Sequence, residues 1–330
     1  MKAWLQLFRV PNLFTVPGDP LAGFLIATGG RLDSRAVCAV LASLCIYAAG
    51  LAMNDLADFA EDLRERPKRP LPSGAISRSA AWIVVANLIL LGLGLCFLAG
   101  PAAVLMGLGT ILGVVLYNFL TKRIPVIGAL NMGLCRGLSL LLGAAAGLAP
   151  DPMLLDGALP LAVFQPLALA LHAVFTQAGG HRSFTFFMAV GAAALVAIYI
   201  AAVTNLARFE TRRDYPRLPR VLPLGALLIG FVILKMATDT LLRDPSPALW
   251  LVGIILCAMN TAELMREPPA PLPPRIGAFI RIMPVLQAAL CLVPSVATGF
   301  HKTPASLIAA LALLACVPIH GWLGKKFYAS

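Results

Sequence analysis

The chain has 330 residues, of which 59% are hydrophobic and only 12% are charged. An ordinary soluble domain carries about 25% charged residues, so this composition excludes a soluble enzyme and a soluble nucleic-acid-binding domain. The formal net charge of +11 does not indicate nucleic acid as a partner, because basic residues between apolar segments orient a membrane protein and contact anionic lipid. We predict an all-α, polytopic protein embedded in a lipid bilayer.

Long apolar segments follow one another along the chain. A membrane-spanning helix needs about 20 mostly apolar residues. The segments that satisfy this requirement are 13–29, 36–53, 80–98, 101–119, 126–149, 184–203, 221–241, 246–264, 277–298 and 304–323. Short basic or proline-rich connections separate them, and no stretch is typical of a separate soluble domain. We therefore expect a single domain over residues 1–330.

A further apolar segment, 158–178, is more polar than the others. If ten helices cross the bilayer and the N-terminus is inside, the basic residues concentrate in the loops on the inner side. If 158–178 also crossed, the later loops would change sides and this asymmetry would disappear. The positive-inside rule favours ten spans, with 158–178 interfacial or re-entrant. Both termini and the polar loops 54–79 and 205–220 then lie on the cytoplasmic side, where the two loops could share one reaction centre.

Four oxygen-bearing residues directly follow the second predicted helix: Asn54, Asp55, Asp58 and Asp62. On a continuing helix Asn54, Asp58 and Asp62 share one face, and Asp55 lies one turn from Asp58. Such a row of like charges is unfavourable unless it is neutralised. Hard oxygen ligands suit Mg²⁺, which takes one or two carboxylates together with substrate phosphates. The motif indicates a magnesium site; the alternative is a solvated loop whose acids and bases cancel.

Four stretches of the sequence together resemble the UbiA superfamily of intramembrane prenyltransferases. The acidic motif and the basic segment after it, which ends in RPLPSGAIS at 69–77, are similar to the first signature of that family. The segments 9–23, 117–122 and 128–137 resemble its opening helix, the end of its fourth helix and its fifth helix. The resemblance covers roughly residues 5–220, and the last third of the chain matches only as apolar helices.

The resemblance implies a bundle of nine or ten helices around a central cavity open to lipid. In that family the acidic motifs hold Mg²⁺ on an isoprenyl diphosphate, whose prenyl group passes to an acceptor. The residues that it implies as magnesium ligands are Asn54, Asp55, Asp58 and Asp62, with the three aspartates as catalytic residues. Arg69 and Lys122 would offset charge on the leaving group. The other residues implied in substrate binding are Tyr117, Asn131, Arg136, Arg208, Glu210, Asp214, Asn12 and Asp19.

The second aspartate-rich motif of the family, often DxxxD, is altered in this chain, which reads TNLARFETRRD at 204–214. Glu210 and Asp214 could form a shifted acidic pair. Alternatively, Thr204 and Arg208 occupy the aspartate positions, and the planar fork of Arg208 binds phosphate oxygens directly. A basic loop that anchors the membrane face is the third interpretation. The altered motif leaves the number of magnesium ions open, and it also resembles a subgroup such as the EboC-like proteins.

The resulting hypothesis is a Mg²⁺-dependent prenyltransferase of isoprenoid biosynthesis in the inner (cytoplasmic) membrane. Its partners are an isoprenyl diphosphate and a small, aromatic or lipid-like acceptor whose identity the sequence does not specify. The alternative is a transport or binding protein that retains the prenyl-diphosphate pocket without turnover, because the second motif is degenerate.

Overall fold

The computed structural model describes residues 2–148, 181–210, 215–237, 245–266, 270–293 and 303–328. Within these ranges the regular structure is helical, without a β-strand. The helices are α1 (Lys2–Leu7), α2 (Val10–Leu13), α3 (Gly18–Thr28), α4 (Ser34–Ala57), α5 (Phe59–Glu65), α6 (Arg78–Ala99), α7 (Pro101–Phe119), the 3₁₀ turn η1 (Thr121–Arg123), α8 (Ile127–Leu148), α10 (His181–Ala207), α11 (Arg217–Ala237), α12 (Pro245–Met265), α13 (Leu272–Ile280), α14 (Met283–Cys291) and α15 (Pro304–Tyr328). The segment 158–178 and Asp214 lie outside the described residues.

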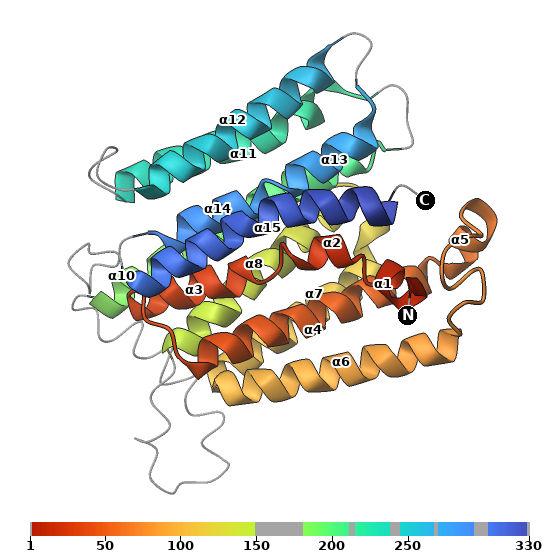
Figure 1. Ribbon diagram of the computed structural model, residues 1–330, viewed down its shortest axis with the longest axis horizontal. Helices are drawn as coiled ribbons and strands as arrows, with labels where there is room; N and C mark the ends of the chain where they lie inside the picture. Colours follow the sequence, from red (N-terminus) through yellow and green to blue (C-terminus); the bar gives the residue numbers. More distant parts are fainter. Residues whose placement is uncertain are drawn as a thin grey trace, which may run out of the picture.

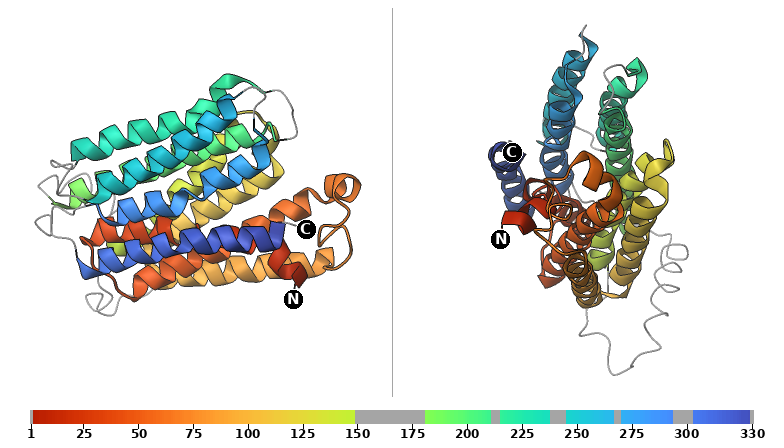
Figure 2. Two further views of the ribbon diagram at one scale, coloured as in Figure 1. Left: turned by 45° about the horizontal axis from the view of Figure 1, so that its top comes forward. Right: turned by 90° about the vertical axis from the view of Figure 1, so that its right-hand side faces the viewer.

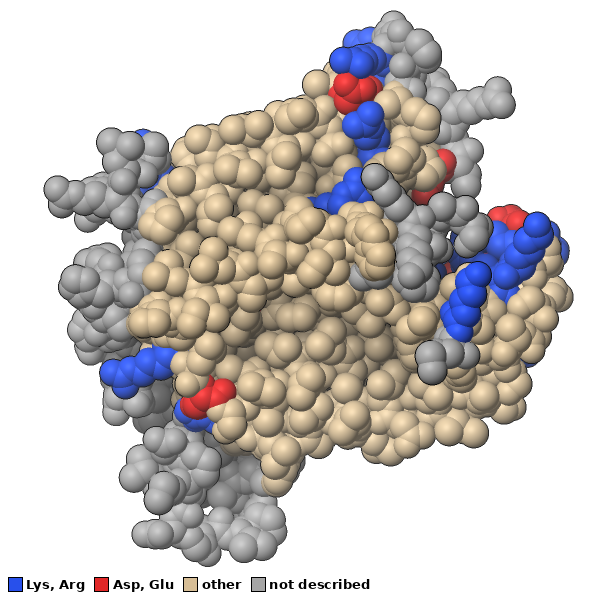
Figure 3. All heavy atoms as spheres, viewed as in Figure 1, with Lys and Arg blue, Asp and Glu red and all other residues tan. Residues whose placement is uncertain are grey.

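Eight helical segments in the described ranges are long and apolar enough to cross a bilayer. They are α4, α6, α7, α8, α10, α11, α12 and the α13–α14 pair, and α15 adds a shorter apolar stretch, Pro304–Ile319. On the face seen in Figure 3, charged side chains gather mainly at the end that carries α5, and a broad band of other residues covers the middle. The predicted all-α, multi-pass membrane bundle is confirmed.

The first predicted span, 13–29, is not one helix. The structure instead has α1, α2 and α3, of which α3 has only 11 residues. Arg9 interrupts the helical path with a left-handed backbone, φ 44° and ψ 56°. Pro17 and Pro20 lack the N–H that a helix interior needs, but proline is tolerated where a helix starts. Helix α3 therefore begins only at Gly18.

The predicted span 277–298 is also interrupted. Its helical part begins earlier, at Leu272, and breaks between α13 and α14 at Arg281 and Ile282. Pro284 follows the break, where its ring would clash with the carbonyl of the residue four positions earlier in a continuous helix. Figure 1 shows α13 and α14 end to end along the bundle.

Helix α8 is the central element, and it packs against α3, α7 and α10. The contacts are close because glycines face neighbouring backbones. A Cβ atom at Gly143 would lie 1.8 Å from the carbonyl oxygen of Pro20, and one at Gly133 would lie 2.2 Å from that of Ala197. The pair α11–α12 flanks α10, whereas α4 packs on α6 and α7 on the opposite side of the bundle (Figures 1 and 2).

The polar loops predicted to share a face begin at the same end of the bundle. Helix α4 runs toward α5, and α10 runs in the same direction (Figure 1). Helix α8 ends, and α10 begins, at the opposite end. The acidic motif after α4 and the residues after α10 are therefore on one side of the molecule, as the span count predicted.

Candidate functional site

The acidic motif does not continue as one helix. Helix α4 ends at Ala57, and Asp58, with φ −89° and ψ 4°, is both the last cap of α4 and the first cap of α5. Glu61 and Asp62 then lie in the first turn of α5, where negative charge stabilises a helix N-terminus. The expected single face of Asn54, Asp58 and Asp62 is therefore wrong, because the backbone turns at Asp58.

Two of the motif carboxylates share one guanidinium. Nη1 of Arg69 lies 2.6 Å from Oδ2 of Asp62 and 3.8 Å from Oδ1 of Asp55. The same Asp55 oxygen accepts a hydrogen bond of 2.8 Å from Nη2 of Arg9. The side chains of Asp55 and Asp62 are only 7% and 4% exposed. A buried carboxylate without a cation is strongly unfavourable, so these arginines neutralise the pair.

Asp58 has a different partner. Its Oδ1 forms an ion pair with Nζ of Lys122, which belongs to η1 between α7 and α8. The motif is thus divided into an Asp55–Asp62 pair held by arginines and a separate Asp58–Lys122 pair. Arg69 and Lys122, which the family resemblance placed near the leaving group, both contact motif aspartates.

The carboxylate pair fits the donor set of a magnesium ion. Across the described residues, no group of three or more His, Cys, Asp or Glu side chains is placed to hold a metal. Mg²⁺ needs only one or two carboxylates, since substrate phosphates and water complete its shell. Asp55 and Asp62 both reach the same guanidinium nitrogen, so a cation near that position is within reach of oxygens from both.

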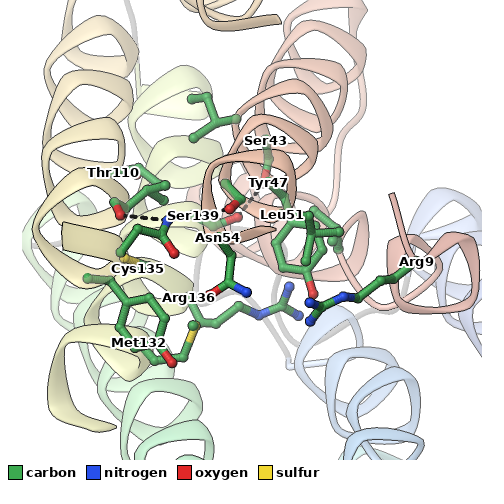
Figure 4. Close-up of a pocket in the computed structure, with 16 residues that line it drawn as sticks. Arg9, Ser43, Tyr47, Leu51, Asn54, Thr110, Met132, Cys135, Arg136 and Ser139 are labelled. Atoms are coloured by element: carbon green, nitrogen blue, oxygen red, sulfur yellow. Dashed lines mark hydrogen bonds between the residues drawn. The ribbon is translucent and has the colours of Figure 1, made fainter. Parts of the chain in front are cut away.

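A cavity of about 160 Å³ lies beside the motif, between α4, α7 and α8 (Figure 4). The polar residues that line it are Arg9, Ser43, Tyr47, Asn54, Thr110, Tyr117, Asn118, Arg136 and Ser139. A second hollow, of about 530 Å³, is lined by Asp55, Arg69 and neighbouring basic residues. Arg9 lines both, so the Arg9–Asp55 ion pair lies between the two spaces.

Arg136 is fixed at the wall of the first cavity by a buried polar network. Its Nη2 lies 2.8 Å from Oδ2 of Asp19 and also donates to the carbonyl oxygen of Thr15. Nε2 of Gln287 donates to Oδ1 of Asp19 and to the same Thr15 oxygen, both at 2.7 Å. Asp19 and Gln287 are fully buried. The network joins α3, α8 and α14 at one point.

Two of the other implied substrate-binding residues lie elsewhere. Asn131 donates to the carbonyl oxygen of Gly113 and to Oγ1 of Thr121, so it ties α8 to α7 and η1. Asn12 is half-buried in α2 and belongs to the lining of neither cavity. Tyr117 does line the first cavity.

The second motif is not brought into either described cavity. Arg208 is exposed, donates to Oδ1 of Asn205 at 3.2 Å and lies over the ring of Phe209. Glu210 is also exposed. As far as the chain is described, no residue of 204–210 lines these cavities. The alternative alignments of this motif therefore stay predictions.

Three residues of the site had no assigned role in the sequence motifs: Arg9, Tyr47 and Gln287. Arg9 lies in the segment that resembles the opening helix, and Gln287 is a polar residue inside an apolar stretch, a pattern that often marks function in membrane proteins. Tyr47 has no comparable signal, because tyrosine is common in apolar helices.

The chain was compared with known proteins. Residues 20–207, from the first turn of α3 to the end of α10, match the model of the UbiA prenyltransferase family. This chain belongs to the UbiA prenyltransferase family. The matched region contains the whole acidic motif, Lys122 and Arg136, whereas Arg9 and Gln287 lie outside it.

Among curated relatives in the UbiA family is a digeranylgeranylglyceryl phosphate synthase of Methanopyrus kandleri. It is 32% identical over 152 residues, which cover 46% of this chain and 56% of that protein. The enzyme of the same name from Methanoregula boonei is 35% identical over 128 residues, covering 39% and 46%. The chain thus spans about half the length of the curated relatives it matches.

Solved structures share the fold. A UbiA homolog from Aeropyrum pernix K1, in its apo form, superposes with a TM-score of 0.62 at 17% identity, covering 84% of this chain and 96% of that one. A UbiA homolog from Archaeoglobus fulgidus, bound to GPP and Mg²⁺, gives 0.58 at 15% identity, covering 96% and 99%. The structural likeness extends beyond the 20–207 region to the C-terminal helices.

Proposed function

We propose that this UbiA family member is a Mg²⁺-dependent prenyltransferase that moves a prenyl group from an isoprenyl diphosphate to a small acceptor within the membrane. The observation that carries the proposal is the buried Asp55–Asp62 pair, which Arg9 and Arg69 neutralise beside a cavity. The names of its relatives and the GPP and Mg²⁺ held by one structural neighbour support it.

The cations of the site have two uses in this proposal. Magnesium, when bound by Asp55 and Asp62 with Asn54 and Asp58 nearby, would neutralise the diphosphate and weaken its bond to the prenyl carbon. Arg9, Arg69 and Lys122, which contact the motif carboxylates, would supply N–H donors to the phosphate oxygens. Arginine suits this task because its planar fork matches phosphate geometry.

The cavity would control the fate of the prenyl group. Its apolar walls, formed by residues such as Ile46, Val114 and Met132, exclude bulk water and protect a reactive allylic group from hydrolysis. In the transfer, the bond between the prenyl carbon and the diphosphate oxygen breaks, and its electron pair leaves on the diphosphate. A new bond joins that carbon to the acceptor, and the acceptor's proton passes to the departing diphosphate.

We place the α5 end of the bundle on the cytoplasmic side of an inner membrane, with both termini there. Arg64, Arg66, Lys68 and Arg69 lie in or just after α5, and basic residues prefer the cytoplasmic face. Helix α10 runs toward the same end of the bundle. Arg208 and Glu210 follow it directly, and Asp214 comes later in the sequence, outside the described residues. They remain proposed contacts to the diphosphate, either directly or through a second ion.

The test compares two aspartates at opposite ends of α4. Asp55→Asn removes a motif carboxylate. Asp33→Asn is the matched control, because asparagine also caps a helix N-terminus. Partial burial raises the pKa of Asp33, but hydrogen bonds from Arg35 outweigh this and lower it, so Asp33, too, is an ionised residue in an ion pair.

The assay measures Mg²⁺-dependent binding of labelled geranyl and geranylgeranyl diphosphate, and prenylated product with an acceptor panel. We expect binding by the wild type and Asp33→Asn, and at least a tenfold loss in Asp55→Asn. Equal diphosphate binding by the two variants, or diphosphate binding that does not depend on magnesium, would refute the proposal. Tight, magnesium-dependent binding without product across a broad panel would favour a binding protein instead.

A further inference from the structure

Arg136 is a buried arginine with donor capacity that the protein does not use. The residue is 6% exposed, and its Nε has no hydrogen-bond partner among the described residues. Its polar contacts with Asp19 and Thr15 both use Nη2, and its guanidinium carbon lies 5.9 Å from the centre of the Tyr47 ring. Figure 4 shows the guanidinium at the cavity, near Asn54 and Tyr47. A buried N–H without a partner is costly, so a small shift of the side chain that brought Nε against a ligand oxygen would satisfy it.

The charge of Arg136 is already compensated. Asp19 lies 2.8 Å from it and is fully buried, and Gln287 fixes that carboxylate with a hydrogen bond of 2.7 Å. Gly18 makes room for this arrangement, since a Cβ there would lie 2.3 Å from Oε1 of Gln287. Arg136 and Asp19 together form a neutral wall with free N–H donors.

The other cation at the cavity is also paired. Arg9 contacts Asp55, and in the proposed function it would donate to the diphosphate. The remaining polar groups at the cavity are uncharged hydroxyls and amides, including Tyr47, Ser43 and Ser139, whose Oγ atoms are 2.6 Å apart. No cation of this lining is thus left to balance a second anion.

The space beside Arg136 suits a small group. Its volume of about 160 Å³ is close to the ~150 Å³ that holds one benzene molecule in an engineered protein cavity. One small ring or a short polyol fits there as the acceptor group, with apolar contacts from residues such as Ile46 and Val114.

We infer that the acceptor presents a neutral, hydroxyl-bearing group to this cavity, and that Arg136 selects it by donating from its unused edge. A carboxylate or phosphate in the same place would be a buried anion next to Asp19 without a cation of its own, which is unfavourable. Gln287 and Asp19 are positioning residues for Arg136. The inference rests on the proposed function but concerns only the acceptor.

The first experiment measures acceptor binding without diphosphate or magnesium, so that its outcome is independent of prenyl transfer. The probes are matched pairs of similar size: hydroquinone against 4-hydroxybenzoate, and glycerol against glycerol phosphate. We expect the purified protein to bind the neutral member of at least the aromatic pair ten times more tightly. Equal or tighter binding of the anionic members, or binding of no probe, overturns the inference. Failure of the proposed function would appear separately, as the absence of Mg²⁺-dependent diphosphate binding.

The second experiment changes the charge of the wall. Asp19→Asn leaves Arg136 uncompensated, so the preference should shift at least tenfold toward 4-hydroxybenzoate. Arg136→Gln should weaken hydroquinone binding. Arg220→Gln is the matched control, because Arg220 is also buried with an unpartnered Nε in the described structure but does not line the cavity. The assignment is contradicted if Asp19→Asn keeps the wild-type preference for hydroquinone, or if Arg136→Gln and Arg220→Gln lose equal hydroquinone affinity. If Asp19→Asn does not fold, the comparison of the two arginine variants is the test.

Discussion

Nη2 of Arg9 lies 2.8 Å from Oδ1 of Asp55, across 46 positions in the sequence. The ion pair joins the break between α1 and α2 to the last turn of α4, and Arg9 lines both the cavity and the second hollow. Arg9 reaches this position with a left-handed backbone conformation, which is rare for a residue with a side chain. Such strain often accompanies function.

Replacing Arg9 should separate backbone strain from ligand binding. The left-handed conformation costs a residue with a Cβ roughly 1–2 kcal/mol. Glycine avoids that cost, so Arg9→Gly should be about 1 kcal/mol more stable than Arg9→Ala in thermal unfolding. Both variants should bind prenyl diphosphate at least tenfold more weakly than the wild type. If Arg9→Gly retained full affinity, Arg9 would have only a structural role.

The glycine contacts of α8 should control the geometry of Arg136. In Gly143→Ala the new Cβ would meet the Pro20 carbonyl oxygen at 1.8 Å, so α3 must move away and carry Asp19 with it. We expect destabilisation of about 1–3 kcal/mol, as for other overpacked sites, and loss of acceptor binding.

Gly191→Ala in α10 is the control for that substitution. An added Cβ there has no described atom within 4 Å. Alanine is favoured over glycine inside a helix by roughly 0.5–1 kcal/mol, so this variant should be as stable as the wild type or more stable. Thermal unfolding in detergent measures both, and equal effects would show that close packing at Gly143 is unimportant.

Removing magnesium should not unfold the protein. Asp55, Asp58 and Asp62 each contact a cation of the chain itself, so chelation leaves no unpaired carboxylate. We expect the midpoint of thermal unfolding to change by less than about 3 °C in EDTA, equivalent to ~1 kcal/mol at this size. Magnesium together with prenyl diphosphate should raise it through binding to the folded state. Cooperative unfolding in EDTA alone would contradict this picture.

Substituting Lys122 should lower the turnover rate more than substituting the adjacent Arg123. Lys122→Gln removes the partner of Asp58 and, in the proposed function, a cation near the leaving group; electrostatic groups of this kind contribute roughly 10²–10³-fold to rate. Arg123 is the next residue and is exposed, so Arg123→Gln should lower turnover less than threefold. The comparison uses initial rates at saturating diphosphate, and similar rates in the two variants would remove Lys122 from the site.

The sequence by itself determined the fold class, because its apolar segments with few charges have the length of about 20 residues that a membrane-spanning helix needs. It also identified the acidic motif, whose residues lie within nine positions of one another, and the family resemblance pointed to the cations Arg69 and Lys122. The family resemblance at residues 54–77 was likewise readable from the chain alone, and the match over 20–207 agrees with it.

Only the tertiary structure decided which cation each carboxylate of the acidic motif contacts. Spacing on an ideal helix placed Asp58 and Asp62 on one face. In the structure the backbone turns at Asp58, so that Asp62 forms an ion pair with Arg69 and Asp58 forms one with Lys122. The contact of Asp19 with Gln287, 268 positions apart, has no local signature at all. Side-chain periodicity reports which face of a helix is apolar, but the partner of a buried charge depends on which helices pack together, and that is settled by the close approach of α3, α8 and α14.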